Sequence, residues 1–217
     1  MKLLKCFGFA IMLALLMSQA AAQKPQWENP DYDAVRDFSG QSNPNGVWSY
    51  GWETSFGAAL TLYTDSDTTC RPGLTVWSVV PGCDDNPVLA HNDSGKTVCD
   101  ELNRTCYPAN YLDLHPGPNG EYSVLRWTAP ISGWFMLETA FEGLDADNGG
   151  ADVHILVRNH ASLFSGPVNT YWVPLAYRTR VKVSAGDTVD ILVGFGQNGN
   201  YYNDSTGVRF ALTRLGQ

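Results

Sequence analysis

The sequence predicts an all-β fold, an antiparallel β-sandwich of the jelly-roll type. Short apolar segments recur along the chain and are separated by turns rich in Gly, Pro, Asn and Asp, which is the pattern of successive short strands. Several of these segments alternate apolar and polar residues with a period of two, as half-buried strands do. No window of helical length has the i, i+3, i+4 apolar spacing of an amphipathic helix.

The first 22 residues have the pattern of a secretory signal peptide. Lys2 and Lys5 precede a short apolar run that ends in three alanines, which is a small-residue cleavage site before Gln23. The run is too short to span a bilayer, and no second apolar span follows it. We therefore expect an exported protein, secreted or held at the cell surface. Residues 23–36 are expected to form a polar N-terminal arm, and residues 37–217 a single sandwich domain.

The expected strands follow one another through this domain. The segment 152–158 alternates most cleanly, because Val153, Ile155 and Val157 point to one face. Residues 184–187 form a tight turn between two later strands. The other expected strands are 47–52, 58–63, 74–80, 122–127, 134–141, one or two strands within 171–183, then 189–194 and 208–215.

Residues 64–118 differ from the rest of the chain, because they hold many prolines, a cluster of acids and every cysteine beyond the leader. We expect an irregular excursion from the sandwich whose conformational entropy is limited by disulfides. An even number of cysteines in an exported chain favours two disulfides and leaves three pairings open. We favour Cys70–Cys83 and Cys99–Cys106, because each closes a small local loop. A zinc site is the alternative, but the usual C-x-x-C spacing is absent.

The net charge excludes two classes of partner. Two of the 14 Lys and Arg residues lie in the leader and none of the 22 Asp and Glu residues does, so the rest of the chain carries a net charge of −10. An acidic surface repels phosphate backbones and anionic lipid, so we expect no nucleic-acid or membrane partner. The same charge favours solubility and attracts divalent cations.

Several short motifs together resemble a known family. They are DFS at 37–39, NPNGVWSYG at 43–51, LHPG at 114–117, RWTAP at 126–130, GDTVD at 186–190 and NYYNDSTG at 200–207. The pattern covers nearly the whole chain after the leader and resembles the secreted β-sandwich domain of exported, PEP-CTERM-sorted and other bacterial cell-surface proteins. The resemblance implies a jelly-roll sandwich similar to non-catalytic carbohydrate-binding modules. No C-terminal sorting signal accompanies the motifs, so we expect retention at a surface to need another contact.

Exposed aromatic rings are the first candidate for a binding site. Sugar rings stack their C–H faces on flat aromatic surfaces while neighbouring polar groups bind the hydroxyls. Adjacent residues of a strand face opposite sides, so at least one residue of an adjacent aromatic pair lies outside the core. The predicted platform consists of Tyr171, Trp172, Tyr201 and Tyr202. Core positions remain the alternative for these pairs, and they are the expectation for Trp48, Tyr50, Trp52 and Trp127.

The second candidate is a calcium site in the acidic stretch 145–152. Carboxylates at alternate positions followed by glycines can wrap a hard cation with oxygen ligands. The EF-hand pattern is incomplete, since Leu156 stands where the bidentate acid belongs, and a solvated acidic turn is the alternative. Asp204 together with Asp37 is a further acidic pair at the ends of the domain. The predicted calcium ligands are Asp145, Asp147, Asn148, Asp152 and Asp204.

Three Asn-x-Ser/Thr triplets mark glycosylation acceptors if the host glycosylates exported proteins: Asn92, Asn103 and Asn203. Asn92 and Asn103 lie in the expected surface excursion and are therefore the better acceptors. In a bacterium the same triplets arise by chance.

No catalytic motif is present. The sequence contains no G-x-S-x-G elbow, no H-E-x-x-H zinc motif and no phosphate-binding glycine loop, and acid pairs such as Glu138 and Glu142 occur by chance in an acidic chain. We therefore expect a non-enzymatic module that binds an extracellular glycan or a surface protein, with calcium as its expected cofactor. The alternative is a structural or adhesive subunit of an extracellular matrix, coat or filament. A small secreted hydrolase ranks third.

Overall fold

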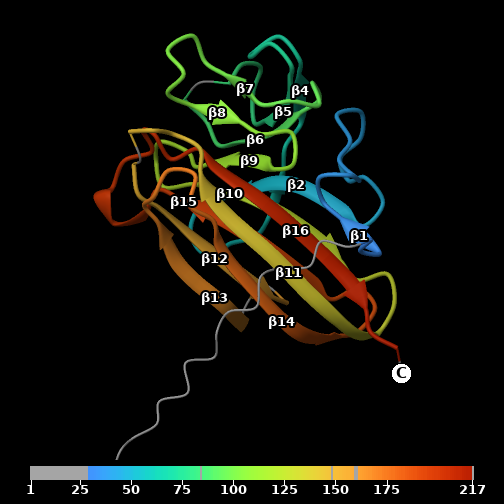
Figure 1. Ribbon diagram of the computed structural model, residues 1–217. Coiled ribbons are helices and arrows are strands. Elements are labelled where there is room, and N and C mark those ends of the chain that lie inside the picture. Colours follow the sequence, from blue (N-terminus) through green and yellow to red (C-terminus); the bar gives the residue numbers. More distant parts are fainter. Residues whose placement is uncertain (1–28, 84, 148, 159–160, 217) are drawn as a thin grey trace, which may run out of the picture.

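The computed structural model describes residues 29–83, 85–147, 149–158 and 161–216. Within these ranges the regular elements are strands, apart from the short 3-10 turn η1 (Gly196–Asn198), and most strands form two antiparallel sheets (Figure 1). Side chains from both sheets share one core, so the predicted all-β sandwich is confirmed. No helix in the described part of the chain is long and apolar enough to cross a membrane.

The first sheet is the larger of the two. Its strands, in hydrogen-bonded order, are β14 (Leu175–Val183), β11 (Gly133–Gly143), β16 (Thr206–Arg214), β9 (Leu112–His115), β6 (Val88–Asn92), β5 (Leu74–Ser78) and β4 (Asp65–Asp67), with β1 (Tyr32–Asp33) paired to β16.

The second sheet covers one face of the first. Its strands, in order, are β13 (Ala161–Val168), β12 (Ala151–Val157), β15 (Thr188–Gly194), β10 (Tyr122–Thr128), β2 (Trp48–Glu53) and β3 (Thr61–Leu62). A separate two-stranded hairpin consists of β7 (Val98–Cys99) and β8 (Cys106–Tyr107). This hairpin lies with β4, β5, β6 and β9 at one end of the molecule (Figure 1).

Aromatic side chains join the two sheets across the core. Trp127 of β10 packs edge-on against Phe135 of β11 with ring centroids 5.2 Å apart, and Trp48 of β2 packs edge-on against Phe210 of β16 at 5.6 Å. All four side chains are buried. Large buried aromatic surface of this kind supplies much of the apolar stabilisation of a sandwich. The expected core positions of Trp48 and Trp127 agree with the structure.

The strands with clear alternation lie where the sequence predicts them. β10, β11, β12, β15 and β16 each begin and end within two residues of the expected bounds. In the long segment 171–183, β14 begins at Leu175, directly after Pro174, because proline cannot donate a hydrogen bond within the sheet.

The segment 64–118 is more regular than expected. Its strands β5, β6 and β9 extend the first sheet beyond β16 rather than forming an irregular excursion. β6 and β9 were not predicted because each is short and carries polar residues, such as Asp113, among its apolar ones. The exposed edge strand β13 was missed as well, because its apolar residues do not alternate regularly.

The described part of the expected N-terminal arm packs against the sandwich. Tyr32 in β1 lies opposite Leu212 of β16, and Ala34 is buried in the core. Residues 1–28, which include the expected signal peptide and the start of the arm, lie outside the described residues.

Candidate functional site

A cavity of about 360 Å³ lies on the outer face of the first sheet, away from the sandwich core. Its apolar floor comes from β5 and β6, where Val76, Val88 and Ala90 point outward while Trp77 and Leu89 point into the core. This alternation follows from the period-two geometry of strands. Its walls are loops of the segment 64–118 on one side and the loop between β15 and β16 on the other.

Strand β9 places two titratable side chains in the cavity. Leu112 and Leu114 face the core, so the intervening Asp113 and the following His115 face the cavity. Nothing in the local sequence indicates this placement, because the strand itself was not predicted. Asp113 and His115 are therefore candidate site residues that the sequence analysis did not propose as ligand-binding.

Asp113 is a buried acid with one unsatisfied oxygen. The side chain is buried, and its Oδ1 atom has no hydrogen-bond partner in the described structure. Burial raises the pKa of Asp113 to about 7, against the opposing effects of the Arg71 guanidinium and a backbone N–H donated by Thr206. An acceptor left unpaired inside a cavity costs free energy unless a ligand or water supplies a donor.

His115 is held as a neutral hydrogen-bond acceptor. Its Nδ1 donates to the carbonyl of Pro116 at 2.9 Å, which leaves Nε2 as the acceptor nitrogen. Burial lowers the pKa of His115, and the nearby Arg71 acts in the same direction. The ring packs edge-on against Tyr201 with centroids 5.9 Å apart.

Two of the predicted platform residues lie at the cavity. Tyr201 and Tyr202 line it with ring centroids 4.5 Å apart, and 63% of Tyr202 is exposed. The hydroxyl of Tyr201 donates to Asp85 on the opposite loop. The other predicted pair, Tyr171 and Trp172, is also exposed but does not line the cavity.

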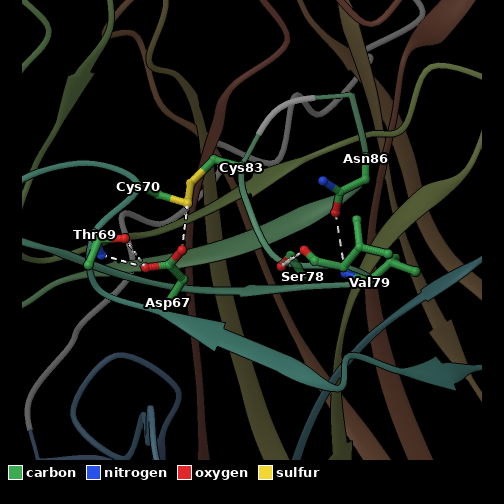
Figure 2. The surroundings of a disulfide bond; sticks show 8 residues. Asp67, Thr69, Cys70, Ser78, Val79, Cys83 and Asn86 are labelled. Atoms are coloured by element: carbon green, nitrogen blue, oxygen red, sulfur yellow. Dashed lines mark hydrogen bonds between the residues drawn. A yellow bond between two sulfur atoms is a disulfide. The ribbon is translucent and has the colours of Figure 1, made fainter.

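The structure contains both expected disulfides, Cys70–Cys83 and Cys99–Cys106. Figure 2 shows the first of them near Asp67, and apart from it Asn86, whose side-chain oxygen accepts a hydrogen bond from the backbone of Val79 at 3.2 Å. Cys83 itself lines the cavity. Other residues that line the cavity lie close in sequence to these cysteines, namely Arg71, Asp85, Asn86, Thr105 and Tyr107. The disulfides therefore fix the loops that form the cavity wall.

Asp204, one of the predicted calcium ligands, lies on the loop between β15 and β16 that also carries Tyr201 and Tyr202. Asp204 is only 2% exposed and both of its carboxylate oxygens lack partners. Burial raises its pKa to about 7, and the negative charges of Asp152 and Asp145 act in the same direction. Asp204 is therefore an uncompensated acid with two other acids nearby.

The remaining predicted ligands already have partners. Asp145 accepts hydrogen bonds from the Thr105 hydroxyl at 2.7 Å and from the backbone of Asp147 at 2.8 Å. Asp152 accepts from Tyr122, His154 and the backbone of Gly196. Within the described ranges, no three residues among His, Cys, Asp and Glu are placed to share a metal ion.

Two acids from the calcium hypothesis have other partners in the structure. Asp147 pairs with Arg104 at the surface. Asp37 accepts hydrogen bonds from Arg36 and Trp48 rather than joining Asp204. Asn148 lies outside the described residues.

The three glycosylation triplets lie in different environments. Asn92 is only 3% exposed and donates hydrogen bonds to the carbonyls of Lys96 and Tyr107. The expectation that Asn92 is a good surface acceptor is therefore wrong, because its amide is occupied within the fold. Asn103 and Asn203 are exposed, and Asn203 borders the cavity.

Solved structures with low similarity to this chain include carbohydrate-binding modules. No family model matches the chain, and no curated protein matches it. Among solved structures, the CBM51 of Clostridium perfringens GH95 in complex with methyl-galactose is 14% identical with a TM-score of 0.34, over 70% of this chain and 95% of that one. The CBM35 of Paenibacillus barcinonensis is 13% identical with a TM-score of 0.32, over 67% and 96%. A family 35 module from an environmental isolate is 16% identical with a TM-score of 0.32, over 55% and 82%.

Proposed function

We propose that the chain is an exported, non-catalytic module that binds extracellular or cell-surface carbohydrate in the cavity beside Tyr201. One observation carries the proposal: a cavity of ligand size brings two neighbouring, tilted tyrosine rings together with an apolar floor and with Asp113, a buried acid with one unsatisfied oxygen. The rings supply a stacking surface for a sugar, and Asp113 and His115 supply acceptors for its hydroxyls.

A hydrolytic role fits the same cavity less well. Hydrolysis of a glycosidic bond requires one protonated acid and a second carboxylate that is free to act as base or nucleophile. Asp113 has the raised pKa of an acid, but both oxygens of Asp145 are engaged in hydrogen bonds within the fold. Asp85 is likewise engaged with the Tyr201 hydroxyl.

The rival role as a matrix or filament subunit relied in part on a free N-terminal arm. In the described residues that arm is paired to β16 through β1, and Ala34 anchors it in the core. This part of the chain is therefore not free to contact a second molecule.

Binding is tested with a glycan array on the purified chain lacking residues 1–22. We expect binding to one class of glycan, lost in Tyr201→Ala and retained in Tyr171→Ala, because Tyr171 lies outside the cavity. No binding to any glycan, or equal loss in both variants, would contradict the proposal.

We further propose that Ca²⁺ binds at Asp204. The two unpartnered oxygens of this buried acid fit a hard cation that takes oxygen ligands, and the nearby charges of Asp145 and Asp152 favour a cation at this place. Backbone carbonyls and water complete the ligand set of many calcium sites, so three protein carboxylates are not required. The ion would fix the loop that carries Tyr201 and Tyr202 beside the cavity.

Calcium binding is tested by thermal unfolding with Ca²⁺ or a chelator. The ion should raise the Tm by at least about 3 °C, which corresponds to about 1 kcal/mol in a domain of this size. Asp204→Asn should remove the increase, whereas Asp147→Asn should keep it, because Asp147 pairs with Arg104 at the surface. An equal response of all three proteins would place the ion elsewhere.

A further inference from the structure

We propose that the sugar taken by the cavity carries a free, protonated amino group, as in a hexosamine that is not N-acetylated. The inference deepens the proposed carbohydrate-binding function and rests on it. It follows from the charges that face the cavity, from one buried oxygen without a donor, and from the aromatic rings around it.

The charged side chains of the cavity are unbalanced toward the acidic side. Asp85, Asp113 and Asp145 line it, and the cation among its described lining residues is Arg71. Burial lowers the pKa of His115, which favours the neutral form of this lining histidine. A concave site lined by one sign of charge concentrates ligands of the opposite sign and repels its own, so uronic and sialic acids are unfavourable ligands.

Two of the three acids have neutral hydrogen-bond partners inside the protein. Asp145 is bonded to a hydroxyl and a backbone amide, and Asp85 is bonded to the Tyr201 hydroxyl. Arg71 is exposed, and its guanidinium lies 5.8 Å from the centre of the Tyr107 ring. The charge of Arg71 is close enough to Asp113 to oppose the rise in the pKa of that acid, but Arg71 does not hydrogen-bond Oδ1 of Asp113.

Asp113 presents the acceptor that an ammonium group would satisfy. The residue lines the cavity, and its buried Oδ1 has no partner in the described structure. A neutral hydroxyl would supply a hydrogen bond alone, whereas an ammonium group would supply the bond and the compensating charge. Loss of that charge by N-acetylation leaves the carboxylate uncompensated.

The aromatic rings favour the same ligand. Tyr107, Tyr201 and Tyr202 all line the cavity. The faces of aromatic rings carry partial negative charge and attract a cation within about 6 Å of the ring centre. Rings and carboxylates together therefore favour a cationic sugar over a neutral one.

The test measures calorimetric binding of three matched disaccharides: β-1,4-linked glucosamine, its N-acetylated form, and the glucose disaccharide cellobiose. We expect the glucosamine disaccharide to bind at least about tenfold more tightly than the other two. Asp113→Asn should reduce this preference to about twofold or less. Glu101→Gln removes one negative charge from an exposed position outside the cavity and should leave the preference intact.

The outcomes separate the inference from the proposed function. Equal or tighter binding of the neutral disaccharides, lost in Tyr201→Ala, would overturn the amine preference and leave carbohydrate binding in place. A glucosamine preference that survives in Asp113→Asn, or that falls equally in Glu101→Gln, would also overturn it. Absence of binding by any glycan, on the array as well as in calorimetry, would overturn the proposed function and the inference with it.

Discussion

The hydroxyl of Tyr201 donates a hydrogen bond to Asp85, a residue 116 positions earlier in the chain. The bond joins the loop between β15 and β16 to the loop that follows the Cys70–Cys83 disulfide. One ring of the aromatic platform is thus tied to a covalently fixed segment across the mouth of the cavity. An immobilised ring loses less conformational freedom when a ligand stacks on it.

Tyr201→Phe separates the two contributions of this side chain. The variant keeps the ring but loses the bond to Asp85, so we expect carbohydrate affinity to fall by roughly threefold to tenfold. Tyr201→Ala removes the ring as well and should weaken binding further. Calorimetric titration measures both, with Tyr171→Phe as the control outside the cavity. Full affinity in Tyr201→Phe would mean that the bond contributes nothing to the site.

Removal of the Cys70–Cys83 disulfide should lower the carbohydrate affinity while leaving the secondary structure of the sandwich unchanged. The bond closes a loop with a sequence separation of 13, for which chain entropy predicts a stabilisation of about 3 kcal/mol. We expect the Cys70→Ser, Cys83→Ser double variant to lose at least about tenfold in affinity, since Arg71 and Asp85 would no longer be fixed. Its far-UV circular dichroism should stay that of the parent, because both cysteines lie outside the main core.

The second disulfide is the matched comparison. Cys99–Cys106 has a sequence separation of 7, for which the same model predicts about 2 kcal/mol. The corresponding double serine variant should therefore have the smaller loss in unfolding free energy. Chemical denaturation measures both losses, and the reverse order would contradict the entropic account.

The fold was largely predictable from the sequence, and the site only in part. Alternation along a single segment locates strands such as β12, because one side of the strand faces the core and the other does not. A short strand such as β9 gives too few residues for the pattern to appear, and its neighbours in the sheet are distant in sequence. Tyr201 was recognisable as an aromatic outside the core, whereas Asp113 was not recognisable as its companion.

The predicted pairs of aromatic residues illustrate the same limit. Part of each pair is exposed, as expected, but both pairs lie in loops between strands, so strand alternation is not the reason. Exposure alone gives no information on whether Tyr171 and Tyr201 lie on one surface. The structure places only the second beside the cavity. Proximity between loops depends on the order of strands in the sheets, which a single sequence does not reveal.

Stability without calcium should decrease as the pH rises from about 4.5 to about 7. Burial raises the pKa of Glu53 to about 7, with the charge of Asp190 acting in the same direction, and Asp113 is raised similarly. Because the pKa is raised in the folded state, the folded chain still holds a proton between about pH 4.5 and pH 7, whereas the unfolded chain has already released it. The free energy of unfolding is therefore greatest below the ordinary pKa of these acids and decreases as the pH approaches 7. Thermal unfolding in the presence of a chelator measures the loss.

Glu53→Gln isolates one contribution to this pH dependence. Glutamine has nearly the same shape but does not titrate, so the variant should lose less stability between pH 5 and pH 7.5 than the parent does. Glu101→Gln is the exposed control and should follow the parent. If the unsubstituted protein instead becomes more stable over this range, the charges of these buried acids are balanced by partners in solution.

Gly149→Ala tests the packing of the acidic loop against Asp204. A Cβ atom at position 149 would collide with Oδ1 of Asp204 and with the backbone carbonyl of Tyr202. The carbonyl belongs to the main chain and cannot rotate away, so the loop must move, at a cost of about 1–3 kcal/mol.

That displacement should separate Gly149 from the carbonyl of Asn203, to which its amide donates at 3.0 Å. The variant should therefore lose the calcium-dependent increase in Tm together with part of its carbohydrate affinity, since Asp204 and Tyr202 lie two residues apart on one loop. Gly133→Ala is the control, because a Cβ there meets only ordinary van der Waals contacts, 3.7 Å from the Arg214 side chain and 3.8 Å from that of Phe135. If Gly149→Ala lowers the Tm but responds to Ca²⁺ as the parent does, the ion does not bind at Asp204.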